Sequence, residues 1–176
     1  MLLTWNKKKP ASPFYRRAGS YAFSITQEKQ RRKENTMNND FDMKDAVRSP
    51  NIEKKFAKYL VGQRIDHAEE DKLYLKNGMI LTFYESKFDF CTSAEGEWSI
   101  LQAENLDAII TNVEAYCAQN DEDDEQYLKV NILHNQNIVA QGFGCTAPQM
   151  FYVTALSVKV QLVKNTVDDF EVLGYD

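Results

Sequence analysis

Between Gly62 and Val163, apolar and polar residues alternate in short runs with a period of two, which is the spacing of half-buried β-strands. Two such runs, residues 72–76 and 79–85, flank the dipeptide Asn77-Gly78. Asn-Gly is a strong hairpin signal, because both central residues of a type I′ turn need positive φ. We therefore predict a hairpin with a two-residue turn, in which Tyr74 faces Leu81. Both of its faces are apolar, so we expect both to be covered.

The same pattern predicts a mainly β fold of about seven mostly antiparallel strands, arranged as a sheet or a sandwich. One short helix is expected before them, at residues 52–60, with Asn51 as its N-cap, because Ile52, Phe56 and Tyr59 form one apolar stripe. Residues 86–99 and 120–125 are expected to be loops. The other strands are expected at residues 63–69, from about 110 to 118, at 127–134, at 138–144 and at 152–163, the last being the longest.

The chain has 176 residues, enough for one domain with a hydrophobic core. We expect this domain to span residues 51–163, with a C-terminal tail at 164–176. Residues 1–50 are expected to be a disordered or non-native extension, because residues 1–36 show no sustained period. The run Arg31-Arg32-Lys33-Glu34 is what a purine-rich bacterial ribosome-binding site encodes when read in frame, so we predict that the natural protein starts at Met37.

Charge also divides the chain near Met37. Residues 1–36 carry nine Lys or Arg and two Glu, whereas residues 37–176 carry twelve Lys or Arg and twenty-four Asp or Glu, a net charge of −12. Because phosphates are neutralised by basic surfaces, we do not expect the acidic domain to bind nucleic acid directly. The longest apolar run is a handful of residues, so we expect no contact with a membrane.

The sequence contains no recognisable catalytic, metal or cofactor motif, and we predict none of the three. Three cysteines without a CxxC pair or an export signal indicate free thiols in the cytoplasm. Zinc ligands could be drawn from His67, Cys91, His134 and Cys145, but their spacing matches no finger or ribbon. Cys91 with either histidine as its base is the corresponding catalytic alternative, with no local signature around it.

Two polar segments supply the candidate binding residues. Residues 89–99 place carboxylates, a thiol and an indole in an expected loop, which is typical either of a binding patch or of a compact loop anchored in the core by Trp98. Residues 121–125 form an acidic run, typical of a solvated hairpin loop or of an interaction surface. This run is no EF-hand, because the required glycine and bidentate glutamate are missing. The candidates are Asp89, Cys91, Glu95, Glu97 and Trp98, together with Asp121, Glu122, Asp123, Asp124 and Glu125.

Several short motifs resemble a small uncharacterised domain family that is common in phages and prophages of bacteria. The resemblance covers about residues 61–163 and implies a phage-encoded cytoplasmic protein without assigned activity. Two departures concern possible sites: Phe90 stands where members often have a second cysteine, and residues 147–150 replace a glycine-rich stretch. The matching motifs are Leu73-Tyr74-Leu75-Lys76-Asn77-Gly78, Leu81-Thr82-Phe83-Tyr84-Glu85, Cys91 with Glu95-Gly96-Glu97-Trp98, Ile110-Thr111-Asn112-Val113, His134-Asn135 and Leu156-Ser157-Val158-Lys159-Val160.

These observations favour a non-enzymatic accessory protein that binds a host protein, for example to inhibit a defence or nucleic-acid enzyme. Its acidic surface would complement the basic channel of such an enzyme. The first alternative is a virion or self-assembling structural protein, whose sheet edges or apolar hairpin make the subunit contacts. The second alternative is a small Cys/His-dependent enzyme or metal module. The sequence does not define the oligomeric state.

Overall fold

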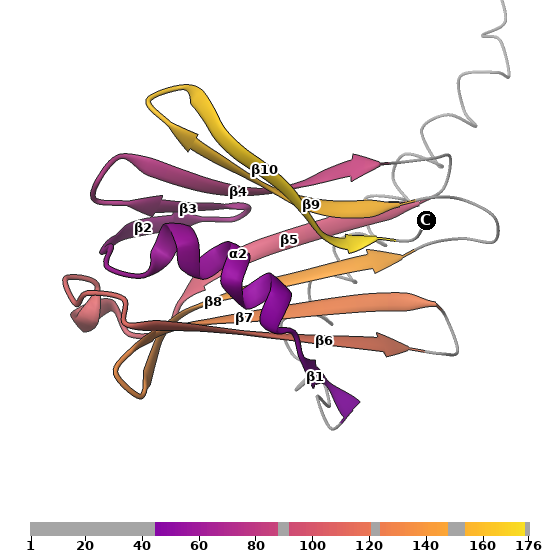
Figure 1. Cartoon of the computed structure of the whole chain (residues 1–176), viewed down its shortest axis with the longest axis horizontal. Helices are drawn as coiled ribbons and strands as arrows, with labels where there is room; N and C mark the ends of the chain where they lie inside the picture. The colour runs from indigo at the N-terminus through magenta and orange to yellow at the C-terminus, as the bar shows by residue number, and fades with distance from the viewer. Residues whose placement is uncertain (1–44, 88–91, 121–123, 148–153, 175–176) are drawn as a thin grey trace, which may run out of the picture. The chain divides into compact units, whose positions relative to one another are not determined.

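The structure is a computed structural model and describes residues 45–87, 92–120, 124–147 and 154–174. In these residues, ten strands form two antiparallel five-stranded sheets that do not join into a closed barrel (Figure 1). The elements are β1 (Val47–Arg48), α2 (Pro50–Leu60), β2 (Ile65–Glu69), β3 (Lys72–Leu75), β4 (Met79–Lys87), β5 (Ser93–Ile100), the 3₁₀ helix η2 (Ala103–Asn105), β6 (Asn112–Asn120), β7 (Glu125–His134), β8 (Asn137–Ala147), β9 (Ala155–Leu162) and β10 (Asn165–Gly174). The mainly β prediction is thus confirmed, with ten strands in place of seven.

The two sheets pack face to face around one hydrophobic core. Sheet A has the strand order β1-β6-β7-β8-β5, and sheet B has the order β10-β9-β4-β3-β2. Leu128, Val130 and Ile132 of β7 are fully buried on the inner face of sheet A, and Leu156, Val158 and Val160 of β9 are fully buried on that of sheet B. This period-two burial is what the sequence predicts for both strands.

Glycines on the inner face of sheet A let the aromatic core lie close to the backbone. An added Cβ on Gly96 would lie 2.5 Å from Cγ of Phe83, and one on Gly142 would lie 2.7 Å from Cζ3 of Trp98. The rings of Phe83 and Trp98 are stacked, with centroids 4.7 Å apart. Gly142 and Gly144 therefore serve close packing within strand β8.

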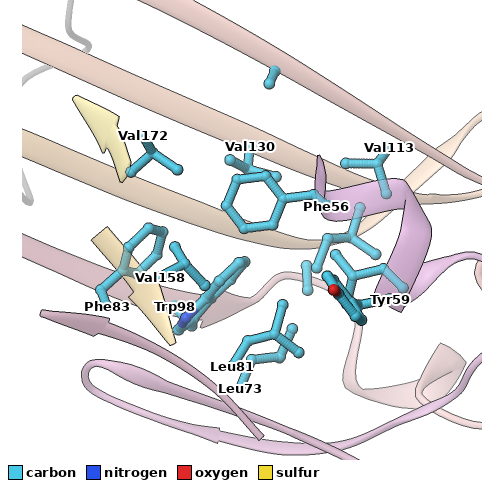
Figure 2. Packing of buried hydrophobic residues seen from close by; sticks show 14 of the residues in the cluster. Phe56, Tyr59, Leu73, Leu81, Phe83, Trp98, Val113, Val130, Val158 and Val172 are labelled. Atoms are coloured by element: carbon cyan, nitrogen blue, oxygen red, sulfur yellow. The ribbon is translucent and has the colours of Figure 1, made fainter. Parts of the chain in front are cut away.

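Helix α2 covers the side of the molecule where the edge strands of the two sheets lie. Phe56 projects from it into the core, where its ring makes edge contacts with Phe83 and Trp98 (Figure 2). On one flank, the Glu53 carboxylate accepts the Ala115 N–H of β6 at 3.2 Å. On the other flank, Lys55 Nζ donates to the Glu171 carbonyl of β10 at 3.0 Å. Side chains of α2 thus bind backbone groups of both sheets, in β6 of sheet A and in the edge strand β10 of sheet B.

The helix begins slightly earlier than expected. Pro50 is its first residue, Ser49 occupies the N-cap position, and Asn51 lies inside the helix rather than capping it. Proline is favoured in the first turn because its missing N–H would have no partner there.

The β3–β4 hairpin exists, but its predicted register is wrong by one residue. Tyr74 pairs with Ile80 and Leu73 with Leu81, because the turn has three residues rather than two. Gly78 donates its N–H to the Leu75 carbonyl and alone has positive φ (+83°), which is typical of a type I turn followed by a bulge. Leu73 and Leu81 therefore share the buried face, while Tyr74 and Ile80 lie half-buried on the outer face, so the hairpin is not covered equally on both sides.

Other sequence predictions also need correction. Residues 93–99 belong to strand β5 and are not a loop, and residues 165–174 form strand β10 rather than a tail without structure. Among the described residues, the longest strand is β8, with 11 residues, rather than β9. In the turn between β7 and β8, Asn135 adopts positive φ (+55°). The extension was expected at residues 1–50. Residues 1–44, with the predicted Met37 start, lie outside the described residues, but Val47–Arg48 form strand β1 and Pro50 begins helix α2, so the expected extension is wrong for this stretch.

Candidate functional site

The structure separates the candidate residues into three groups. Asp89, Cys91, Asp121, Glu122 and Asp123 lie outside the described residues. Trp98 is in the core, whereas the remaining four candidates lie on one sheet or at its end, as follows.

Trp98 is a core residue and not part of an exposed patch. It is 4% exposed, and its ring stacks on Phe83 and meets the Phe56 ring edge-on with centroids 6.0 Å apart. The expectation that Trp98 anchors this segment in the core is confirmed, but the anchored element is a strand. Its Nε1 has no hydrogen-bond partner among the described residues.

Glu95 and Glu97 lie on the outer face of sheet A. Alternate residues of β5 point inward, so these two glutamates lie opposite to buried Ala94 and Trp98. Across the ladder to β8, Glu95 pairs with Cys145 and Glu97 with Phe143.

The acidic run near residue 125 ends on the same face. Asp124 is exposed in the β6–β7 turn with φ of +54°, and Glu125 begins β7. Glu125 accepts a hydrogen bond from the hydroxyl of Tyr127, the next outward residue of β7. Tyr127 pairs with Cys145 of β8, and its ring centroid lies 6.2 Å from that of Phe143.

Sheet A thus brings both candidate segments together across β8. The register forms one row from Glu95 through Cys145 to Tyr127, and a parallel row from Glu97 through Phe143 to Lys129. Adjacent strands lie about 4.8 Å apart, so Glu95 and Tyr127 are separated by about 10 Å. We call this surface the acidic–aromatic face; it comprises Glu95, Glu97, Glu114, Tyr116, Glu125, Tyr127, Lys129, Phe143 and Cys145.

The β6 side of this face carries a further acid and a further aromatic residue. Tyr116 donates a hydrogen bond to Glu114 at 3.1 Å. Burial, and then this hydrogen bond, raise the pKa of Tyr116, so its phenol is neutral at physiological pH. The face therefore presents neutral phenol rings beside carboxylates.

The aromatic members of the face are residues that sequence reasoning did not select. A signal for Tyr127 existed, because the inward positions Leu128 and Val130 place it on the outer side of the same strand. For Phe143 no such signal existed. Its neighbours on the face, Glu97 and Lys129, are distant in the sequence and are brought beside it only by the register of the strand ladders.

The residues of the catalytic and zinc alternatives are dispersed. His67 lies in β2 of sheet B, stacked on Tyr74 with its Nδ1 2.7 Å from Asp66, whereas His134 ends β7 of sheet A with its Nδ1 2.8 Å from the Ile109 carbonyl. Within residues 45–87, 92–120, 124–147 and 154–174, no three His, Cys, Asp or Glu side chains are grouped to hold a metal ion.

The outer face of sheet B carries a separate polar network. The Tyr84 hydroxyl donates to the Asp169 carboxylate at 2.7 Å, and Lys159 Nζ lies 4.5 Å from the Tyr84 ring centroid. Burial, followed by the bond to Asp169, raises the pKa of Tyr84 to about 12. Ser86 and Ser157 share a hydrogen bond at 2.6 Å. These side chains use their hydrogen-bonding groups on one another, which is typical of a structural network rather than of a reactive site.

Cys117 borders a cleft of about 490 Å³ between sheet A and the end of β10, with Val172 and Leu173 on the opposite side. Burial raises the pKa of the Cys117 thiol. A thiol with a raised pKa is a poor nucleophile, because the thiolate is the reactive form.

A comparison with protein-family models, with curated proteins and with solved structures finds no match to this chain. In the part of the chain that the structure describes, no helix is long and apolar enough to cross a bilayer.

Proposed function

We propose that this chain is a non-enzymatic, phage-encoded accessory protein that binds a basic surface of a host protein through the acidic–aromatic face. The observation that carries the proposal is the meeting of Glu95, Glu97 and Glu125 around the Tyr127–Phe143 ring pair. The phage origin and the cytoplasmic location rest on the sequence resemblance and on three cysteines that form no CxxC pair.

The chemistry of the face suits a partner rich in Arg or Lys. Carboxylates attract such side chains, and phenol and phenyl rings offer them cation–π contacts. Aromatic residues also supply much of the binding energy in protein interfaces. A net charge of −12 over residues 37–176 would steer a basic partner toward the chain at low salt.

The partner's surface would be the nucleic-acid-binding channel of an enzyme, since such channels are lined with Arg and Lys. Occupying the channel would inhibit the enzyme by competition and would need no chemistry from this chain. The described residues support this mechanism because their carboxylates are displayed on a sheet, whose rigid backbone fixes their spacing.

The test is capture of a partner from lysate of the host bacterium by immobilised wild-type chain and by two charge-reversed variants. Glu95→Lys with Glu97→Lys alters the face. Glu69→Lys with Glu104→Lys is the matched control, because both residues are exposed elsewhere and the net charge changes by the same amount. Circular dichroism verifies that both variants fold.

We expect the wild type and the control to retain the same partner at about 0.1 M salt and the face variant to lose it. At about 1 M salt the wild type should lose it as well, because the Debye length falls from about 10 Å to about 3 Å. Retention of no partner at either salt concentration would contradict the proposal. So would equal losses from the two variants, which would indicate only non-specific attraction by net charge.

A further inference from the structure

The turn between β9 and β10 has a backbone that its residues disfavour. Leu162 pairs with Asn165, so Val163 and Lys164 are the two central residues, with φ of +48° and +71°. Positive φ at both positions defines a type I′ turn, for which Asn and Gly are preferred. A β-branched residue such as Val163 is a strong outlier there, because its side chain crowds the backbone.

The disfavoured residue is also the most exposed large apolar side chain of the described residues. Val163 is 79% exposed, Leu162 is 38% exposed, and Val167 on the following strand is 50% exposed. Asn at position 163 would relieve the backbone strain and would suit the solvent better. Strain that the fold retains, combined with an exposed apolar side chain, points to a contact that uses this side chain.

A hollow lies beside this turn on the same sheet. It has a volume of about 510 Å³ and is lined by Asp66, Tyr74, Leu75, Lys76, Gly78, Met79 and Ile80. Leu162 pairs with Met79, and an added Cβ on Gly78 would lie 3.9 Å from Cδ1 of Leu162, so turn and hollow are adjacent. The β9–β10 and β3–β4 turns both lie at the left end of the molecule in Figure 1.

We propose that a second copy of this chain binds at this end of sheet B, with Val163 of each copy seated in the hollow of the other. An apolar projection beside a hollow on one surface is self-complementary, which is what a two-fold interface requires. The charges agree with this arrangement, because Lys164 accompanies the projection and Asp66 lines the hollow. The charge of Lys76, which also lines the hollow, is compensated by its ion pair with Asp107. The contact is distant from Glu95 and Glu125 at the start of β5 and β7, so it leaves the acidic–aromatic face accessible.

Sedimentation equilibrium of the full chain tests the proposal, over concentrations from about 5 µM to about 500 µM, which cover a weak dimer. Val163→Asn removes the projection, and Ile80→Lys places a charge in the hollow. Val47→Asn is the matched control, because Val47 is a valine of 70% exposure on sheet A. We expect the wild type and the control to dimerise and both other variants to bind at least tenfold more weakly.

A stability measurement separates loss of contact from loss of folding. Asn favours the turn, so Val163→Asn should raise the thermal midpoint of the dilute monomer by about 2–4 °C while it weakens dimerisation. A wild-type chain that stays monomeric at every concentration would overturn the proposal. This holds even if Val163→Asn abolishes binding of a different protein, because the occupant of the hollow would then not be a second copy of this chain. Dimerisation that Val163→Asn leaves unchanged would also overturn it. Neither result would affect capture of a partner through Glu95 and Glu97.

Discussion

The close approach of the two sheets predicts that two glycines differ sharply in their tolerance of alanine. At Gly96, the new methyl carbon would lie 2.5 Å from Cγ and 2.7 Å from Cβ of Phe83. Carbon atoms prefer separations of about 3.5–4.0 Å, and Phe83 is held by stacking on Trp98. We therefore expect Gly96→Ala to lower the free energy of unfolding by about 3 kcal/mol, the upper part of the range for overpacked cores.

At Gly144, the methyl carbon would meet only the Cδ2 atom of Leu156 closely, at 2.4 Å, and its next neighbours lie at 3.7 Å. A leucine methyl can move by a change of rotamer, so the expected loss for Gly144→Ala is about 1 kcal/mol. Loss of glycine entropy in the unfolded chain offsets part of either cost, by about 0.4–1 kcal/mol. Urea unfolding followed by tryptophan fluorescence measures both values. A Gly96→Ala variant as stable as the wild type, or more stable than Gly144→Ala, would refute the packing described above.

Three further predictions concern the helix and two ionisable groups. Phe56→Ala should lower the free energy of unfolding by about 3–5 kcal/mol, because the ring is fully buried among aromatic residues; a loss below about 1.5 kcal/mol would contradict its place in the core. The hydrogen bond from Tyr59 lowers the pKa of Asp168 in the folded protein. The contribution of the ionised Asp168 carboxylate to folding stability is therefore complete above the unfolded pKa of about 3.9 and is lost as pH falls through the folded pKa. Asp168→Asn should thus flatten the acid limb of a plot of urea midpoint against pH, and an unchanged slope would contradict this. Tyr84, with a pKa of about 12, should stay protonated at about pH 11 in an ultraviolet titration, and Asp169→Asn should lower that pKa; ionisation of Tyr84 at an ordinary pKa near 10 would be the contrary result.

The strands that the sequence predicts well are those with large apolar residues on alternate positions. Strand β9 is an example, since Leu156, Val158 and Val160 give an unmistakable period of two. Strand β5 was missed because its inward positions include Ala94 and Gly96, which carry almost no hydrophobic signal. The same small residues allow Phe83 to pack close to the backbone, so the weak pattern has a structural cause.

Strand β10 was missed for a different reason. Its turn carries Val163 and Lys164, neither of which is a turn residue, and its outward positions hold acids such as Asp169. The hairpin at Asn77-Gly78 was found, but its register was not, because Asn-Gly fits a two-residue turn and a three-residue turn with a bulge equally well. A register shift of one residue moves every side chain of a strand to the opposite face of the sheet. The sequence prediction therefore placed residues of β3 and β4 on a common face that in fact lie on opposite faces.

The candidate site shows the same limit. Glu95, Glu97 and Glu125 are visible in the sequence as acidic residues in two separate segments. Their common face and the interposed Phe143 depend on ladders between β5, β8 and β7, which no local pattern specifies.

Site-specific photo-crosslinking in the host bacterium tests the central claim most directly. A photoreactive amino acid at Glu97, on the acidic–aromatic face, should give one adduct of defined mass to a host protein. The same amino acid at Glu69, exposed on sheet B, should give none of that adduct. The same adduct from both positions, or no adduct from Glu97, would contradict the claim that this face binds a host protein.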